Sequence, residues 1–314
     1  MTQPPGFSHA SRDEMIDIIT RLAKVPDTAR VFSVSAEEAR LRYRMGVEIL
    51  DSMVELGLPA RDVDGTRCFD PFDLLNSSAH LGCSPASRIP RRLWPTALNQ
   101  PPDVGAVSYE VTYRPSCPEP GHSGDCILSF ALPGGRRARR IVRGGAPLPA
   151  VTARVRLGAS WPELPPEVRE ALGAVTDLSL MWLPEAVATD LEFARATKLA
   201  DCAGVCRILF EEGRRLNLPT RTSFGLAVAP PFAVPHHWAE FRVGGVWVPV
   251  DPVLIGAMVG WGALDRAQWP RHRSVGAILV RVSSRRVPFA VHGGRPAPVS
   301  LVTRHIGTEN APVL

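Results

Sequence analysis

The sequence predicts an α+β protein in which helices come first and a further helix, followed by antiparallel strands, forms the second half of the chain. Three observations support this class: two capped amphipathic stretches near the N-terminus, alternating apolar and polar residues between positions 105 and 160, and an amphipathic stretch at 201–218 followed by a β-hairpin. Segregated helices and antiparallel strands are typical of α+β folds. With 314 residues, 45% of them hydrophobic, the chain is long enough to bury a full core.

Two sequence signals mark the starts of N-terminal helices. Ser11 and Glu14 match a capping box, in which each side chain accepts a hydrogen bond from the backbone N–H of the other residue. The apolar residues that follow recur at helical spacing. A second capping box, at Ser35 and Glu38, begins a longer apolar stripe that ends near Gly57. We therefore expect an N-terminal helical extension.

The chain from 59 to 104 has a different composition. It is rich in Pro, Gly, Ser and Asp, and its one short apolar piece lies at 71–75. We expect a long irregular surface segment here, which together with the helices makes up a first region at 1–104. Segments of this length inside a compact protein are often functional.

Three alternating stretches follow, with Gly and Pro turns between them. Alternation of apolar and polar residues is the pattern of strands that bury one face. They predict a small antiparallel β segment at 105–160, with strands at 106–113, 127–132 and 151–157.

A cysteine-bearing helix is predicted after Asp201. Cys202, Cys206 and Leu209 share one face at helical spacing, and the pattern continues for about four turns. Pro219 ends the helix, because proline lacks an N–H donor and keeps the residue before it out of the helical region.

Two alternating runs around Gly244-Gly245 predict a β-hairpin with a tight turn. With a two-residue loop, Val243 pairs with Val246, and His236 and Asp251 become diagonal neighbours on one face. His237 then points to the opposite face. A slip of one residue in the pairing would exchange the two histidines.

This set of residues suits nucleophilic acyl transfer. Unpaired N–H groups in the first turn of a helix favour a thiolate, so we expect a lowered pKa for Cys202. A carboxylate at Asp251 can orient the imidazole of His236, which then exchanges protons with the sulfur and the leaving group. Cys206, one turn further along, is interpreted as a small buried hydrophobic residue.

The same residues resemble the transglutaminase-like superfamily. Members carry a cysteine at a helix start, an Ile-Pro-Ala-Arg stretch near the end of that helix, His-x-Trp-x-Glu and Trp-x-x-x-Asp-Pro. The matching positions here are Asp201-Cys202, Leu218-Pro219-Thr220-Arg221, His236-His237-Trp238-Ala239-Glu240 and Trp247-Val248-Pro249-Val250-Asp251-Pro252. The likeness covers about a fifth of the chain. It implies a papain-like core at 161–314, in which a helix packs on an antiparallel sheet, with a catalytic triad of Cys202, His236 and Asp251.

Members of the superfamily often also use a tryptophan upstream of the cysteine to hold the oxyanion. Trp161 and Trp182 both precede Cys202, and no motif selects either of them.

Three functions are compatible with such a core. The first is amide formation, in which an amine takes an acyl group from a small-molecule or carrier-protein-bound donor. The second is hydrolysis by a peptidase or amidase, with water as the acceptor. The third, a binding module on an inactive core, is disfavoured because all three triad positions are present. No cofactor is expected for any of them.

Charge and hydropathy argue against nucleic-acid and membrane partners. The net charge is +5, and the densest arginine cluster, at 136–143, alternates like the solvated face of a strand. Phosphates or an acidic carrier protein could meet it, but it lacks the interleaved aromatics of single-strand binders. No run approaches the roughly 18 apolar residues of a membrane span, and the first residues lack a signal-peptide core. We expect a cytoplasmic protein.

The six cysteines show no CxxC pairing, and free thiols are expected. Cys117, His122 and Cys126 fall within ten residues and are conceivable zinc ligands. Because only three candidates with irregular spacing are evident, a plain loop is favoured and no metal is expected.

Overall fold

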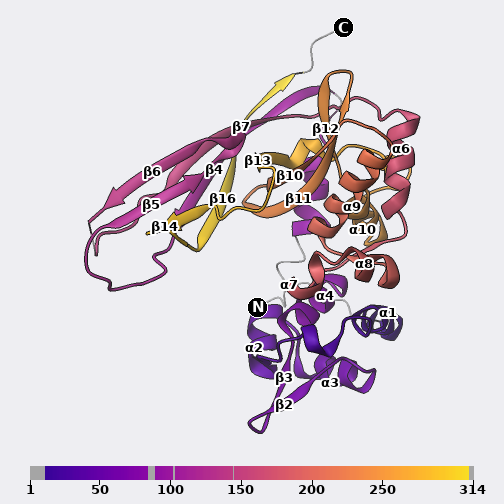
Figure 1. The fold of residues 1–314 in the computed structure, drawn as a ribbon. Helices are drawn as coiled ribbons and strands as arrows, with labels where there is room; N and C mark the ends of the chain where they lie inside the picture. The colour runs from indigo at the N-terminus through magenta and orange to yellow at the C-terminus, as the bar shows by residue number, and fades with distance from the viewer. Residues whose placement is uncertain (1–10, 84–88, 102, 144, 311–314) are drawn as a thin grey trace, which may run out of the picture.

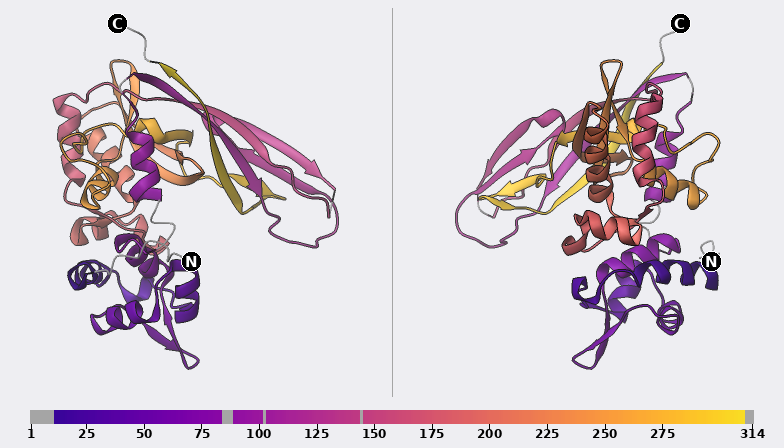
Figure 2. Two further views of the ribbon diagram at one scale, coloured as in Figure 1. Left: turned by 180° about the vertical axis from the view of Figure 1, so that it is seen from behind. Right: turned by 45° about the vertical axis from the view of Figure 1, so that its right-hand side comes forward.

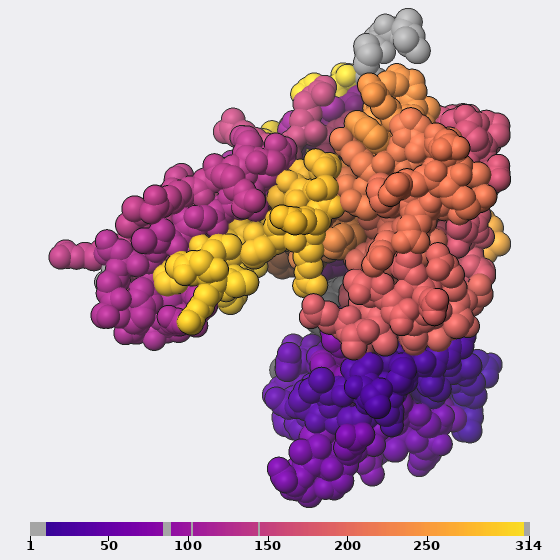
Figure 3. All heavy atoms as spheres, in the orientation of Figure 1, coloured from indigo at the N-terminus to yellow at the C-terminus, as the bar shows by residue number. Residues whose placement is uncertain are grey.

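A computed structural model describes residues 11–83, 89–101, 103–143 and 145–310. Three parts are visible in Figure 1: a mostly helical N-terminal part, a central sheet with helices around it, and a long β arm that extends away from those helices. In the space-filling view the N-terminal part forms a separate lobe beneath the helices of the central part (Figure 3). The α+β class predicted from the sequence, with a helix that begins at Cys202 packed on an antiparallel sheet, is confirmed.

Both predicted capping boxes are present in the N-terminal part. Helix α1 (Arg12–Leu22) begins after Ser11, and α2 (Ala36–Glu38) begins after Ser35. The longer second helix is interrupted, however: a turn of π-helix at Ala39–Tyr43 ends at Arg44, whose φ of 58° is left-handed, and α3 (Val47–Glu55) starts anew.

The expectation of an irregular segment from 59 to 104 is largely wrong, because this range contains regular strands and helices. A small sheet joins β1, β3 and β2, and a ten-residue helix, α4, follows Asp70. The Asp70 carboxylate caps α4 by accepting hydrogen bonds from the backbone N–H groups of Phe72 and Asp73. Pro71 occupies the first turn, where its missing N–H costs nothing, so it begins a helix here and does not break one. The elements are β1 (Val34–Ser35), β2 (Arg61–Val63), β3 (Thr66–Phe69), α4 (Pro71–His80), a π-helical turn (Ile89–Leu93) and α5 (Trp94–Leu98).

One antiparallel sheet crosses the central part and the arm. Its strand order is β13-β10-β11-β16-β4-β7, and β12 pairs with the C-terminal end of β11 on the edge that β16 meets at Phe232. Its strands are β4 (Val104–Pro115), β7 (Val151–Gly158), β10 (Thr220–Ala229), β11 (Phe232–Val243), β12 (Val246–Val250), β13 (Leu279–Ser283) and β16 (Val299–Asn310).

The three predicted strands between 105 and 160 are confirmed as β4, β5 and β7. They do not form a sheet of their own: β4 and β7 extend the sheet that carries β10 and β11, while β5 joins a second sheet of order β15-β14-β5-β6. Pairing therefore crosses the predicted boundaries at 104 and 160, and the division into three domains stays a prediction. The second sheet contains β5 (Cys126–Ala131), β6 (Arg137–Val142), β14 (Ala290–His292) and β15 (Arg295–Pro296).

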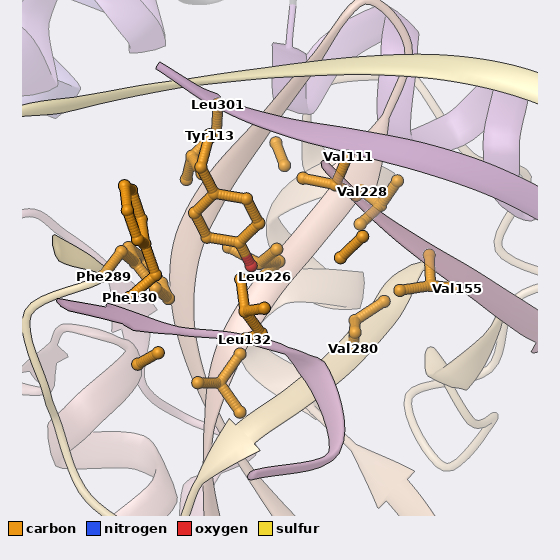
Figure 4. Close-up of a cluster of buried hydrophobic side chains, with 14 of the residues drawn as sticks. Val111, Tyr113, Phe130, Leu132, Val155, Leu226, Val228, Val280, Phe289 and Leu301 are labelled. Carbon is orange, nitrogen blue, oxygen red and sulfur yellow. The ribbon is translucent and has the colours of Figure 1, made fainter. Parts of the chain in front are cut away.

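The arm is held together by an apolar cluster between these two sheets. Tyr113 and Phe130, from β4 and β5, are fully buried, and Phe289 stacks on Phe224 with ring centroids 5.3 Å apart. Figure 4 shows Tyr113, Phe130 and Phe289 in the same buried cluster as Leu226 and Val280 from the central sheet. The arginine cluster lies on and beside β6, and its side chains are exposed as expected for a solvated strand, although the exposure does not alternate: Arg139, Arg140 and Ile141 are all exposed.

Short helices surround one end of the central sheet (Figure 2). Among them, α9 packs on β11 through Val205, Ile208 and Leu209, which meet Phe241 and Val248 in one buried cluster. The segment directly before α9 forms β9, which pairs in parallel with β8, and this pairing fixes its position. The elements here are α6 (Pro166–Leu172), β8 (Ser179–Leu180), α7 (Glu185–Ala188), α8 (Leu191–Thr197), β9 (Leu199–Ala200), α9 (Cys202–Arg215) and α10 (Pro252–Gly260).

Within the described ranges, no helix combines the length and the apolar character needed to cross a membrane.

Candidate active site

The first residue of α9 is Cys202, as predicted. Asp201 is the N-cap, and its carboxylate accepts a hydrogen bond of 2.7 Å from the N–H of Gly204. Burial raises the pKa of the Asp201 carboxyl, while these backbone donors and the nearby His236 oppose the rise. The thiol of Cys202 is half-buried. The candidate nucleophile therefore lies at a capped helix start and is partly accessible to a substrate.

The hairpin has the predicted register. Val243 pairs with Val246 and Ala239 with Val250, and both residues of the turn, Gly244 and Gly245, have positive φ. A two-residue turn with two positive φ values is the type that matches the twist of paired strands.

Asp251 follows the last residue of β12, Val250, and its carboxylate accepts two hydrogen bonds from different elements. One carboxylate oxygen, Oδ1, caps α10 by accepting a 2.9 Å hydrogen bond from the N–H of Leu254. The other, Oδ2, accepts a 2.8 Å hydrogen bond from Nε2 of His236. The carboxylate is 1% exposed. Because its two oxygens have fixed partners on different elements, Asp251 holds the imidazole in one orientation.

Because Nε2 of His236 is bonded to Asp251, Nδ1 is the ring nitrogen that can exchange a proton with Cys202. Burial alone would lower the pKa of the imidazole, but the charge of Cys202, together with hydrogen bonds to Asp251 and Cys202, raises it to about 10. A positively charged ring is therefore favoured at neutral pH, and it is flanked by two groups that carry or can carry negative charge. The structure brings His236 together with both of its predicted partners.

His237 occupies the opposite face of β11. Its ring lies 4.7 Å from that of Phe224 on the neighbouring strand. Burial, and then the positive charges of His236 and Arg286, lower its pKa to about 4. His237 is therefore a neutral packing residue, and it faces away from Asp251.

Cys206 is buried, as predicted. It is 2% exposed, and its thiol donates a 2.9 Å hydrogen bond to the carbonyl oxygen of Trp238. Burial raises the pKa of this thiol to about 12, which keeps it protonated and unreactive.

Three motif positions to which the sequence assigned no role, Arg221, Trp238 and Glu240, form a hydrogen-bond network beside the site. The buried carboxylate of Glu240 accepts hydrogen bonds from Nε1 of Trp238 at 2.9 Å, from Oγ of Ser223 at 3.0 Å and from Nε of Arg221 at 2.6 Å. All four side chains lie on the face of the sheet that carries His236. The alternation of positions 236, 238 and 240 could have predicted this, whereas Ser223 required the register of β10 against β11.

A second tryptophan, Trp94, lies beside His236 in addition to Trp238, and no sequence motif indicated it. Nε1 of Trp161 donates to the carbonyl of Gly158, and the indole fills the space over Gly276. Trp94, from α5, lies with its ring centroid 6.0 Å from that of His236, and its buried Nε1 has no hydrogen-bond partner among the described atoms. The segment around Trp94 was expected to be irregular, so the sequence offered no signal that it would reach His236.

Two further features lie away from these residues. A cavity of about 450 Å³ is bordered by α1, α4, β8 and α10, and none of the three predicted catalytic side chains lines it. In the arm, Cys117, His122 and Cys126 are joined by His292, which the sequence analysis did not connect with them.

Comparisons with known proteins add little to this geometry. No protein-family model and no curated protein sequence matches the chain. Among solved structures, that of a "putative cysteine protease" from Cytophaga hutchinsonii is similar at 12% identity over 67% of this chain and 91% of that chain, with a TM-score of 0.32. At so low a TM-score, the likeness carries no argument about this chain.

Proposed function

We propose that the protein catalyses cysteine-dependent acyl transfer through a thioester acyl-enzyme. Cys202 is the nucleophile, His236 the general acid and base, and Asp251 the group that orients the imidazole. The observation that carries the proposal is the position of the buried His236, which Asp251 holds at 2.8 Å and which lies near enough to Cys202 for the charge of that residue to raise the pKa of the imidazole. This is the arrangement of an activated thiol nucleophile.

In the first half-reaction, the sulfur of Cys202 attacks the carbonyl carbon of the donor. A carbon–sulfur bond forms, and the electrons of the carbonyl move onto its oxygen. Backbone N–H groups at the start of α9 stabilise this oxyanion. The N–H of Gly204 is already bonded to Asp201, so the N–H of Cys202 itself is the donor assigned to this role. Collapse of the intermediate expels the leaving group, which takes the proton of the His236 imidazolium.

In the second half-reaction, an acceptor attacks the thioester. The acceptor gives its proton to His236, the carbon–sulfur bond breaks, and the thiolate of Cys202 is restored beside the imidazolium. The favoured acceptor is an amine, so that the product is an amide. The donor is a small molecule or an acyl group carried by a protein.

Shielding of the base supports an amine acceptor over water. His236 is 5% exposed, because Trp94 and Trp238 flank its ring. A site that excludes bulk water protects a thioester from hydrolysis. An amine that binds in the site then competes well with water for the acyl group.

The test is intact-mass analysis after incubation with simple thioester and amide donors. The expected result is an added mass equal to the acyl group, located on Cys202 and absent from Cys202→Ala. Cys206→Ala, the matched control, should still form the adduct. If Cys202 never acquires an acyl group while another cysteine does, the assignment is wrong.

Supplying an amine distinguishes transfer from hydrolysis. With added amine, an acyltransferase consumes the acyl-enzyme to give the amide, and the yield rises with amine concentration. A peptidase or amidase would release the free acid at a rate that the amine leaves unchanged.

A further inference from the structure

A cluster of cysteine and histidine side chains lies at the end of the β arm remote from α9 (Figure 1). Cys117 and His122 come from the loop between β4 and β5, and Cys126 is the first residue of β5. His292, the last residue of β14, lies 166 positions further along the chain than Cys126. It reaches the cluster because β14 pairs with β5, with His292 opposite Leu128.

The donor atoms converge closely. One nitrogen or sulfur atom from each of the four side chains lies within 4.8 Å of all the others. Nε2 of His122 is 3.2 Å from Sγ of Cys126, and the two histidine rings lie 4.9 Å apart. Zinc bonds of about 2.0–2.3 Å in a tetrahedron place ligand atoms about 3.3–3.8 Å apart, so a small contraction of this cluster would complete the geometry.

Burial supplies an independent reason to expect a ligand. His292 is 8% exposed, and its Nε2 has no hydrogen-bond partner among the described atoms. A buried polar nitrogen without a partner has lost its hydrogen bonds to water and gained none in return, and such a group calls for an unseen ligand. Cys126 is 5% exposed and is a free thiol, as is Cys117.

We propose that Cys117, His122, Cys126 and His292 bind one zinc ion. Two thiolates and two neutral imidazoles offset the charge of Zn²⁺, and two sulfur and two nitrogen donors in a tetrahedron favour zinc over harder cations. Binding releases the two thiol protons to solvent and involves no redox change.

The site is structural, because four protein ligands leave no open position for substrate. Its effect is to fix the irregular loop at 116–125 to β5 and β14. The same loop is also joined to β15 by an ion pair between Glu119 and Arg295. The proposal does not depend on the chemistry of Cys202, which lies at the start of α9.

The sequence favoured a loop without metal because only three candidate ligands lie close together in it. The fourth ligand is supplied by strand pairing, which the local spacing of Cys117, His122 and Cys126 could not reveal.

The experiment measures zinc in the full-length chain, purified under reducing conditions and incubated with zinc sulfate before desalting. The expected result is about one zinc per chain by elemental analysis. Replacement of zinc by Co²⁺ should give the absorption bands of a tetrahedral cobalt site with thiolate ligands. Cys117→Ser and His122→Gln, both in the partly exposed loop, should lose most of the metal.

Two matched variants control for the loss of a cysteine or a histidine. Cys202→Ala and His305→Gln lie outside the cluster and should retain the full zinc content. Circular dichroism of each variant separates metal loss from unfolding. The proposal is overturned if the wild-type chain binds no zinc, if Cys117→Ser and His122→Gln keep it, or if mass analysis after removal of the reductant shows a Cys117–Cys126 disulfide that zinc does not prevent.

Discussion

Two adjacent histidines have opposite environments because β11 alternates its side chains between two faces. His236 lies between Asp251 and Cys202 and has a raised pKa, whereas His237 packs on Phe224 and has a lowered one. A one-residue change of position is therefore enough to convert a candidate base into a packing residue. The residue scale is where the site was most predictable, because a hairpin turn of known length fixes which side chains share a face.

Substitution of each histidine should separate these roles. His236→Ala should reduce acyl transfer as completely as Cys202→Ala, and the double variant should lose no more, because nucleophile and base act as a unit. His237→Ala should keep most of the rate and lower the free energy of unfolding. Steady-state rates and denaturant titrations of the four variants provide the measurement. An inactive His237→Ala beside an active His236→Ala would contradict the assignment.

Asp251→Asn should lower the rate less than loss of the nucleophile does, by roughly 10²–10⁴-fold, because the amide still caps α10 but orients a neutral imidazole poorly. Asp251→Ala should lose the cap as well, at a further cost of about 1 kcal/mol in stability. Comparing the unfolding free energies of the two variants isolates the cap. Equal stabilities would show that the capping hydrogen bond to Leu254 contributes nothing measurable.

The lowered pKa of His237 predicts a stability change in acid. Its folded pKa of about 4 lies below the ordinary value of about 6.5. Its contribution to stability is therefore present above pH 6.5 and is lost as the pH falls toward 4, by an amount on the order of 2 kcal/mol. His236, whose folded pKa is raised, changes stability only above pH 6.5 and does not interfere. His237→Gln should remove the acid-dependent loss in denaturant titrations between pH 7 and pH 4.5; parallel curves would refute this.

At the scale of elements, close contact between helix and sheet decides where α9 can lie. A Cβ atom added to Gly213 would lie 2.1 Å from Oγ1 of Thr220 and 3.0 Å from the ring of Phe241. The helix was predictable from its apolar spacing and from Pro219. The need for glycine at this point was not, since it arises only when α9 packs against β10 and β11.

Gly213→Ala is therefore expected to destabilise the protein by about 1–3 kcal/mol, although alanine is the better helix former. Gly260→Ala, near the end of α10, has no atom within 4 Å of the added Cβ and should leave stability unchanged or raise it by up to about 1 kcal/mol. Thermal unfolding of both variants checks the contrast. A Gly213→Ala protein as stable as the parent would mean that α9 lies further from the sheet.

Other elements were missed for a common reason. The helix after Asp70 and the short helix at Trp94 follow stretches dense in proline and polar residues, which on their own indicate loops. Tertiary contacts decide these cases: Asp73 forms a buried ion pair with Arg30, and Trp94 packs beside His236. Such contacts join residues far apart in the sequence and leave no local pattern.

In the whole molecule, the N-terminal part and the central part are joined by a pair of hydrogen bonds between one side chain and one backbone residue. The side-chain amide of Asn76 donates to the carbonyl of Trp182 at 2.8 Å and accepts from the N–H of the same residue at 2.9 Å. Asn76 is 4% exposed. The two backbone groups of Trp182 thus depend on a side chain from another part of the fold.

Asn76→Ala should lower the free energy of unfolding by about 2–4 kcal/mol, because it leaves both backbone groups of Trp182 unpaired. Asn99→Ala is the matched control and should cost less, because it removes only the single 2.7 Å hydrogen bond that Oδ1 of Asn99 accepts from Nε1 of the buried Trp269. Denaturant titration gives both values. If Asn76→Ala costs no more than the control, the two parts are joined mainly by apolar contacts.

The apolar core of the N-terminal part contains residues that belong to the chain just before the nucleophile. Met181, Leu183, Val187 and Leu199 pack with residues of α1, α3 and α4, and Leu199 is three positions before Cys202. The N-terminal part therefore supports the segment that leads into the start of α9. Substitutions in α1 or α3, remote from His236, should shift that segment and so alter how often the sulfur of Cys202 is directed at its substrate.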